Sequence, residues 1–413
     1  MLYCRTGNDN PGKEFINTEK QLHHSNSSIM KYLNLVFLIL LSGTGIVDAQ
    51  NAPEGVPAPT NVSTTGYPRI LPDNRVIFQV SAPQAVTVQI DLQKRYDMSR
   101  TEAGAWRVIT DPVEPGFHYY SLVIDGGVVA DPASESFYGM GRMASGIDIP
   151  EEGIDFYDAR EVPHGDIRNR IYYSKTTQTW RRINIYTPPG YDNSGKEQYP
   201  VLYIHHGGGE DERGWAVQGK TDLILDNLIA EGKAKPMIVV IPNGNVSKPG
   251  VRAGGYNDEA MAVFKEELFE NVIPFIESNY RVKPGAAYRA ISGLSMGGGQ
   301  AFYTGLRNTD MFANVGVFST GLFGGIGQQS GSQGFDPESV IPGILENSQS
   351  FNKKLRVFYI SVGEQDPRIE PTKKLIETFR GRGLNVEFNS FPGGHEWQVW
   401  RKSLYDFAQK IFK

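Results

Sequence analysis

The sequence predicts a small antiparallel β-sandwich followed by an α/β domain with a mainly parallel sheet. Four short β-branched or aromatic runs lie at 76–80, 86–90, 106–109 and 117–124, separated by Pro, Gly and Asp turns without an intervening helical pattern. From residue 166 onward, apolar runs of strand length alternate with helical patterns. The 413 residues leave room for two or three domains.

Composition and charge exclude several functional classes. The hydrophobic fraction of 39% and the charged fraction of 21% are those of an ordinary globular protein. The formal net charge is -5, the signs are interspersed and no polybasic run is present. We therefore expect neither nucleic acid nor a membrane surface as a partner, and favour a neutral or mildly acidic one.

Residues 30–49 have the pattern of a cleaved export signal. A lysine at 31 precedes the apolar run 33–41, and small residues end at Ala49. The run is shorter than the ~20 residues of a spanning helix. We expect export to the periplasm or the medium, no membrane attachment of the mature form, and a non-native upstream extension at 1–29. The mature chain would then lack Cys4, and with it any disulfide or zinc-thiolate site.

The predicted sandwich covers 70–150, after a flexible lead-in at 50–69 and before a linker at 151–165. It resembles early-set, immunoglobulin-like modules related to carbohydrate-binding family 48. The resemblance is carried by turns and core aromatics at 81–83, 104–106, 115–120, 125–126 and 130–132. Trp106 and Tyr119 are candidates for stacking on sugar rings, but on alternating strands we favour a core role for both.

The second domain, 166–413, should hold its strands in a mainly parallel sheet. Continuous apolar runs at 200–204 and 237–241 are typical of strands buried on both faces. A helical pattern at 264–276 contains Pro274, which is expected to kink or break it. Further strands are expected at 182–186, 288–291, 315–318, 357–360 and 386–388, a helix at 223–230, and a last helix with an apolar stripe at Trp400, Leu404, Phe407 and Ile411.

A Gly-x-Ser-x-Gly sequence, 293–297, lies between an apolar run and a helical pattern. Glycines two residues before and after a serine suit a tight strand-to-helix turn whose strained backbone exposes the hydroxyl. The N-terminal amides of the following helix favour a developing negative charge. Ser295 is therefore predicted to be a catalytic nucleophile.

A nucleophilic serine needs a base that takes its proton and a carboxylate that orients the base. His395 follows the last predicted strand behind a Gly-Gly turn and is the only histidine after residue 206. Asp366 lies in the loop after the preceding strand, which gives the order serine, acid, histidine of α/β-hydrolases. We predict these two partners, with Glu364 of the same loop as an alternative to Asp366.

An oxyanion hole needs two backbone donors. The amide of Met296 should supply one, and Gly208 or Gly209 in the glycine-rich loop after an earlier strand should supply the other. His205 and His206 precede this loop without a nearby Cys or a recognised carboxylate spacing, so we predict no metal and no cofactor. His206 is expected to support the loop.

The second domain resembles the carbohydrate esterase family 1, or esterase D-like, group over nearly all of 165–413. The matching stretches are 180–182, 186–191, 206–209, 241–244, 272–276, 293–298 and 394–395. With the sandwich and the junction at 162–165, the chain resembles bacterial feruloyl esterases that act on arabinoxylan. The resemblance implies Ser295, Asp366 and His395 as the triad, with Met296 and the Gly208 region binding the oxyanion.

The expected reaction is hydrolysis of feruloyl esters on a plant cell-wall polysaccharide or oligosaccharide through an acyl-enzyme. Acetyl-xylan and enterochelin-type esterases remain alternatives, although no dense Arg/Lys loop suits a trianionic substrate. A non-catalytic carbohydrate-binding protein is a further alternative. An aromatic acyl group needs an apolar slot with a polar end. The candidates by loop position are Trp215, Tyr256, Leu322, Phe323 and Trp397.

Overall fold

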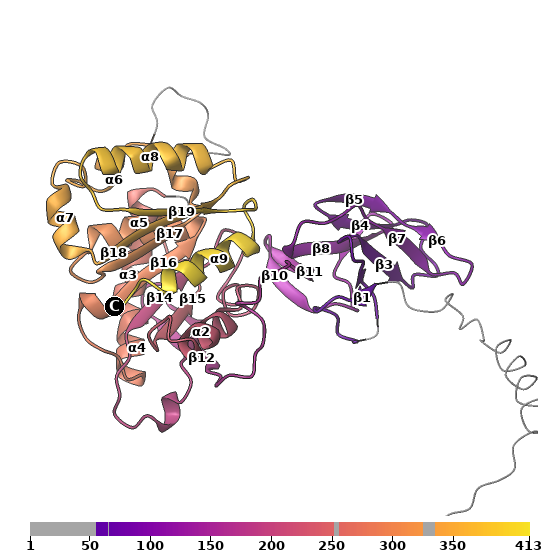
Figure 1. Ribbon diagram of the computed structural model, residues 1–413, viewed down its shortest axis with the longest axis horizontal. Helices are drawn as coiled ribbons and strands as arrows, with labels where there is room; N and C mark the ends of the chain where they lie inside the picture. The colour runs from indigo at the N-terminus through magenta and orange to yellow at the C-terminus, as the bar shows by residue number, and fades with distance from the viewer. Residues whose placement is uncertain (1–54, 65, 252–255, 325–334) are drawn as a thin grey trace, which may run out of the picture. The chain divides into compact units, whose positions relative to one another are not determined.

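The computed structural model describes residues 55–64, 66–251, 256–324 and 335–413 (Figure 1). The predicted upstream extension, the signal peptide and Cys4 lie outside the described residues. Residues from Glu54 to Lys413 belong to one compact unit. Within the described ranges, no helix combines the length and apolar character needed to cross a bilayer.

The N-terminal part consists of two antiparallel sheets around a shared core. One sheet has the order β1-β2-β3-β7-β6, and the other has the order β10-β11-β8-β4-β5 with β9 paired to β8. Phe78, Ile90, Tyr120 and Ile147 are among the residues buried between them. The strands are β1 Val56–Pro57, β2 Arg69–Ile70, β3 Val76–Val80, β4 Val88–Leu92, β5 Lys94–Asp97, β6 Ser99–Arg100, β7 Trp106–Ile109, β8 Gly116–Ile124, β9 Gly127–Val129, β10 Ser136–Gly139 and β11 Arg142–Ile149.

Two segments predicted to be loose are packed. In the predicted lead-in, β1 pairs with β2, and Ala58 is buried in the sandwich core. In the predicted linker, Phe156 and Tyr157 are buried against the second domain, and the Asn227 amide donates to the Phe156 carbonyl at 3.0 Å. Proline, glycine and acidic residues suggest loops in both places, but composition alone does not reveal such long-range contacts.

The second domain is built on an eight-stranded sheet of order β12-β13-β15-β14-β16-β17-β18-β19. β12 and β13 form an antiparallel edge, and the strands from β15 to β19 run parallel. The sequence did not predict β12. The strands are β12 Asp166–Ser174, β13 Thr179–Thr187, β14 Val201–His205, β15 Ile238–Pro242, β16 Arg289–Leu294, β17 Asn314–Phe318, β18 Val357–Gly363 and β19 Glu387–Phe391.

Helices cover both faces of this sheet through two separate apolar clusters. One cluster includes side chains of α3, α5 and α8, and the other includes side chains of α2 and α9 together with Phe117 and Phe137 of the sandwich. The described helices are α2 Thr221–Ala230, α3 Asp258–Glu267, α4 Ile273–Asn279, α5 Met296–Arg307, α6 Pro337–Val340, α7 Ser348–Lys354, α8 Ile369–Gly381 and α9 Trp397–Ala408.

The predicted helix at 264–276 is divided into α3, a π-helical turn at Leu268–Val272, and α4. Pro274 lies in the first turn of α4, where its missing N–H removes no helical hydrogen bond. The helix is therefore irregular at the π turn that precedes Pro274, and not at Pro274 itself.

Candidate active site

The turn between β16 and α5 holds Ser295 in a strained conformation. Its φ is 50° and its ψ is -110°, which a non-glycine residue rarely adopts. A Cβ atom on Gly297 would lie 2.5 Å from the His205 carbonyl oxygen, and one on Gly293 would lie 2.5 Å from the backbone of Gly297. Glycine at both positions is thus required by close backbone approach, and the turn has the form of a nucleophile elbow.

Three predicted residues meet at the carboxyl edge of the sheet. The Nε2 atom of His395 lies 3.0 Å from the Ser295 hydroxyl oxygen, and its Nδ1 atom lies 2.8 Å from the Asp366 carboxylate. They come from the ends of β16, β18 and β19. The arrangement can pass the serine proton to imidazole while the carboxylate stabilises the resulting imidazolium.

Asp366, rather than Glu364, contacts the histidine. Burial alone would raise the pKa of the Asp366 carboxyl, but hydrogen bonds from His395 and Arg368 outweigh burial and hold it below its usual value. The Arg368 guanidinium donates to the other carboxylate oxygen at 2.8 Å. Glu364 is exposed and accepts from the Ser390 hydroxyl at 3.4 Å. The acid at this site is therefore an ionised, fixed carboxylate.

His206 holds the glycine-rich loop after β14 through two contacts of its ring nitrogens with backbone groups. Its Nδ1 atom lies 2.8 Å from the Gly207 carbonyl, and its Nε2 atom accepts from the Gly244 amide at 2.9 Å. Burial lowers the pKa of His206, which fits a neutral ring with one donor and one acceptor. Gly208 lines the cavity beside Ser295, whereas the Gly209 carbonyl accepts from the Gly141 amide of the sandwich at 2.8 Å.

Ser295 opens into a cavity of about 580 Å³ that is walled by both parts of the chain. The sandwich contributes seven of its sixteen lining residues, including a tyrosine, a methionine and an arginine. The lining consists of Asp91, Gln93, Phe117, His118, Tyr119, Met140 and Arg142 from the sandwich, and Gly207, Gly208, Glu210, Leu294, Ser295, His395, Glu396, Trp397 and Trp400 from the second domain.

The Tyr119 hydroxyl joins the two parts at the cavity wall. It donates to Glu210 at 3.1 Å and accepts from Gln218 at 2.9 Å and from the Trp397 indole at 3.2 Å. The other Glu210 oxygen accepts from the Gly207 amide at 3.1 Å, next to Gly208. Burial raises the pKa of Glu210 to about 7. A sandwich side chain thus contacts the carboxyl that holds the glycine-rich loop.

Only one of the five predicted substrate-contacting residues lines this cavity. Trp397 does so, but Trp215 is fully buried and donates its indole N–H to the His205 carbonyl at 2.9 Å. Leu322 and Phe323 are buried in the cluster on the α5 side of the sheet. The Tyr256 hydroxyl donates to the Ser295 carbonyl at 3.1 Å and supports the turn from behind. The prediction was wrong for these four because loop position does not specify which way a side chain points.

Most of the residues that line the cavity were not predicted from the sequence. Tyr119 was expected in the core, and its neighbour Phe117 was expected only as part of a strand, yet both line the cavity. The dense aromatic run at 117–120 was the available signal. The core role expected for Trp106 is correct, because its ring is buried and its N–H donates to the Ala82 carbonyl at 2.9 Å. Trp400 lines the cavity as well as packing in the α9 stripe.

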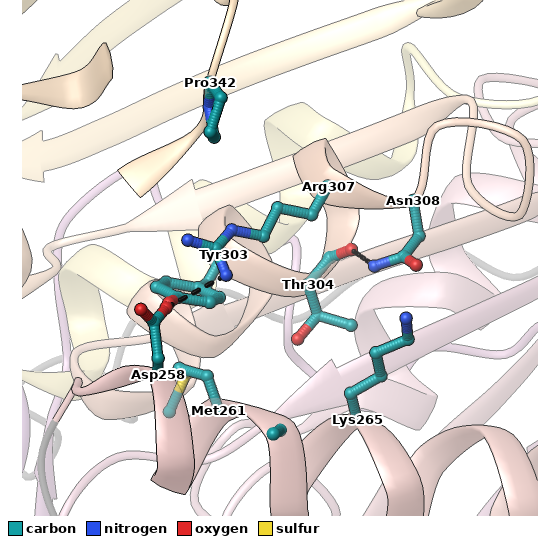
Figure 2. A pocket seen from close by; sticks show the side chains of 9 residues that line it. Asp258, Met261, Lys265, Tyr303, Thr304, Arg307, Asn308 and Pro342 are labelled. Carbon is teal, nitrogen blue, oxygen red and sulfur yellow. Dashed lines mark hydrogen bonds and ion pairs between the residues drawn. The ribbon is translucent and has the colours of Figure 1, made fainter. Parts of the chain in front are cut away.

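A second cavity, of about 550 Å³, lies between α3 and α5 (Figure 2). Its arginine, Arg307, pairs with Asp258 at 3.0 Å and lies over the ring of Tyr303. No serine, cysteine or histidine is among the residues that line it.

Within the described part of the chain, no group of three or more His, Cys, Asp or Glu residues is placed to hold a metal ion.

The family model described as Putative esterase matches residues 174–411. An endo-1,4-beta-xylanase/feruloyl esterase of Xylanibacter ruminicola is 34% identical over 368 residues, which are 87% of this chain and 47% of the relative. Endo-1,4-beta-xylanase Y of Acetivibrio thermocellus is 29% identical over 253 residues, 56% of this chain and 22% of the relative. The chain thus spans less than half the length of these two relatives.

Solved structures of esterases are also similar to this chain. A CE1 ferulic acid esterase of Anaeromyces mucronatus, in complex with ferulic acid, aligns with a TM-score of 0.53 and 28% identity over 62% of this chain and 95% of that one. The enterobactin esterase of Shigella flexneri aligns with a TM-score of 0.61 over 81% of this chain and 92% of that one, at 17% identity, a likeness of fold alone. The second domain has the α/β-hydrolase fold. The chain belongs to the esterase family that the model describes.

Proposed function

We propose that the chain hydrolyses feruloyl esters on arabinoxylan, with Ser295, His395 and Asp366 as the catalytic triad. The observation that carries the proposal is the hydrogen-bonded chain from Asp366 through His395 to Ser295, which ends in a cavity with aromatic walls. The names of the similar proteins, a xylanase/feruloyl esterase and a ferulic acid esterase, support the same acyl group.

The reaction proceeds through an acyl-enzyme. The Ser295 oxygen attacks the ester carbonyl carbon while His395 Nε2 takes the hydroxyl proton. The tetrahedral intermediate collapses, the bond from carbon to the sugar oxygen breaks, and His395 returns the proton to that oxygen. Water then attacks the feruloyl-serine with His395 again as the base, releasing ferulic acid and restoring Ser295.

The Met296 and Gly208 amides are the proposed oxyanion donors. Met296 is the first residue of α5, so its N–H and the positive end of the helix dipole lie beside the nucleophile. Gly208 is favoured over Gly209 because Gly208 lines the cavity, whereas Gly209 contacts the sandwich. The adjacent Gly207 amide is already bonded to Glu210.

The acyl pocket is proposed to consist of Phe117, Tyr119, Trp397 and Trp400. These aromatic side chains line one cavity with Ser295, and its volume of about 580 Å³ lies in the range of small-molecule sites. Phe117, Trp397 and Trp400 are 3%, 1% and 6% exposed, so the argument rests on the volume of the cavity, of which an acetyl group would fill only a small part. The cavity therefore favours a hydroxycinnamoyl group over an acetyl group.

Charge disfavours an enterochelin-type substrate. Apart from the histidines and from Glu210, whose pKa is raised to about 7, the cavity lining contains the carboxylates of Asp91 and Glu396 against one cation, Arg142. A trianionic substrate would meet a net acidic wall, which opposes its binding. The fold likeness to an enterobactin esterase thus carries no weight for the substrate.

The sandwich is proposed to be an early-set, immunoglobulin-like module related to carbohydrate-binding family 48. Its contribution to the wall beside Ser295 supports a role in building the active site. We also propose export to the periplasm or the medium, on the signal pattern at 30–49, with feruloylated polysaccharide as the partner and no cofactor.

Turnover of methyl ferulate and p-nitrophenyl acetate by residues 50–413 tests the proposal. The wild type should hydrolyse both, and Ser295→Ala should lower turnover by roughly 10⁴ to 10⁶-fold with an unchanged circular dichroism spectrum. Turnover of the acetate alone would favour an acetyl esterase. Inactivity of a folded protein on both esters would refute the proposal and favour a non-catalytic carbohydrate-binding protein.

A further inference from the structure

The outer hairpin of the large sheet, β12 and β13, carries an exposed apolar strip. Ile171, Tyr173 and Trp180, which we call the outer aromatic strip, have exposed fractions of 61%, 50% and 69%. Tyr173 lies opposite Trp180 in the strand register, and Ile171 lies opposite Arg182, so these four side chains share one face. The ring centroids of Tyr173 and Trp180 are 5.6 Å apart.

Folding does not require this strip to be apolar. The alternate residues of the hairpin, such as Tyr172 and Ile183, are buried in the core on the other face. The strip leaves apolar surface in water, where polar residues in a strand would be equally compatible with the fold. Adjacent exposed apolar side chains of this kind mark binding surfaces.

The outer aromatic strip lies at the edge of the sheet that holds the active site. Ile183 pairs with Pro242, the last residue of β15, so Trp180 extends beyond the carboxyl end of that parallel strand. In the strand order, β13 is three strands from β16, which leads to Ser295. Three strand spacings correspond to a separation of about 14 to 15 Å between the two strands across the sheet. A few sugar units could span that lateral separation.

Polar, planar side chains connect the strip to the cavity. Arg182 pairs with Glu212 at 2.7 Å, in the segment that continues from the glycine-rich loop. Arg213 of the same segment pairs with Asp211 at 2.6 Å and lies over the ring of Tyr138, 5.2 Å from its centre. Tyr138 belongs to the sandwich hairpin that also carries Met140 and Arg142 of the cavity wall. The exposed Arg182 and the partly exposed Arg213 offer hydrogen bonds to a ligand on this surface, whereas Asp211 and Glu212 are buried.

We propose that the outer aromatic strip binds the sugar backbone of the polysaccharide whose ester group lies at Ser295. This inference rests on the proposed function. The faces of Trp180 and Tyr173 offer apolar contact to the C–H faces of sugar rings, and Arg182 beside them offers hydrogen bonds to hydroxyl groups. Binding there would hold the polymer while its feruloyl side group enters the cavity.

The size of the strip fits a sugar chain better than a protein partner. Large aromatic side chains bury about 150 to 250 Å² each. The exposed fractions of Tyr173 and Trp180 then correspond to roughly 180 to 300 Å² in total, less than half of the ~800 Å² that each partner buries in a standard protein interface.

De-esterified arabinoxylan is the binding probe, titrated into the Ser295→Ala chain by calorimetry. Adding Trp180→Ala or Tyr173→Ala should weaken binding about fivefold or more, whereas Trp180→Phe should retain most of it. Tyr288→Ala is the matched control, because Tyr288 is 38% exposed and lies just before the amino end of β16, whereas Trp180 lies beyond the carboxyl ends of the parallel strands. It should leave binding unchanged.

In chains with Ser295 intact, Trp180→Ala should leave kcat/KM for methyl ferulate unchanged and slow ferulate release from feruloylated arabinoxylan. Absence of binding, or equal binding by the Trp180→Ala and Tyr288→Ala chains, would overturn the inference. Self-association that disappears with Trp180→Ala would instead identify an interface between copies and would also overturn it. Because the probe contains no ester, this result is independent of whether methyl ferulate is hydrolysed.

Discussion

Replacing Glu210 with glutamine should change how the stability of the protein depends on pH. Glu210 is buried beside the oxyanion loop, where it accepts hydrogen bonds from the Gly207 amide and the Tyr119 hydroxyl. Burial raises its pKa from 4.5 to about 7. A glutamine has nearly the same shape as the protonated carboxyl and can still accept from Gly207, but it does not ionise.

The size of the effect follows from the shift in pKa. Between pH 4.5 and pH 7 the folded protein holds the Glu210 proton that the unfolded chain has lost, so the stability of the wild type falls as pH rises through this window. Each pKa unit is equivalent to about 1.36 kcal/mol. The shift to about 7 therefore corresponds to a loss of roughly 3 kcal/mol, complete above pH 7. The variant has no such loss.

Urea unfolding at pH 5, 6, 7 and 8 measures this difference. The free energy of unfolding of Glu210→Gln, relative to the wild type, should increase by roughly 2 to 3 kcal/mol from pH 5 to pH 8. Glu364→Gln is the matched control, since it removes an exposed carboxyl from a neighbouring loop. A Glu210→Gln difference that stays constant with pH, or one that the control reproduces, would refute the reasoning.

Two further substitutions test other contacts. Asp366→Asn should lower methyl ferulate turnover by about 10⁴-fold, because it removes the charge that stabilises the imidazolium, while Glu364→Gln should change turnover by no more than about twofold; equal losses would contradict the assignment. Arg401→Met should lower the free energy of unfolding in urea by about 2 kcal/mol, because it removes both guanidinium bonds to the buried Asp148 carboxylate and leaves it only the Lys220 ammonium at 3.0 Å. Lys373→Met, at an exposed ion pair, should cost less than about 1 kcal/mol, and a similar cost for both would contradict the argument.

The parallel sheet and the meeting of Ser295, Asp366 and His395 could be predicted because their signals are local. Strands buried on both faces need continuous apolar runs, as at β14 and β15. The elbow requires glycine at 293 and 297, because any Cβ there would collide with backbone. His395 and Asp366 then follow from one rule, that the carboxyl ends of parallel strands share an edge.

The substrate pocket could not be predicted because its signals are not local. Trp215 and Phe323 follow active-site strands in the sequence, yet both point into the core. Tyr119 lies 91 residues from Glu210 in the sequence, and only the docking of the sandwich brings them together. A periodicity pattern reports that a strand has a buried face, but it does not report which other element covers that face.

The sandwich and the hydrolase domain belong to one compact unit, and both contribute side chains to the cavity beside Ser295. The buried Arg401 of α9 binds Asp148 of β11, which fixes the two parts against each other. Tyr119 then donates to Glu210, whose carboxyl holds the loop that carries Gly208. A change at the sandwich surface therefore reaches the proposed oxyanion donors through two hydrogen bonds. Under the proposed function, a substitution at Tyr119 should therefore change the rate of ester cleavage, although the sandwich contains none of the proposed triad residues.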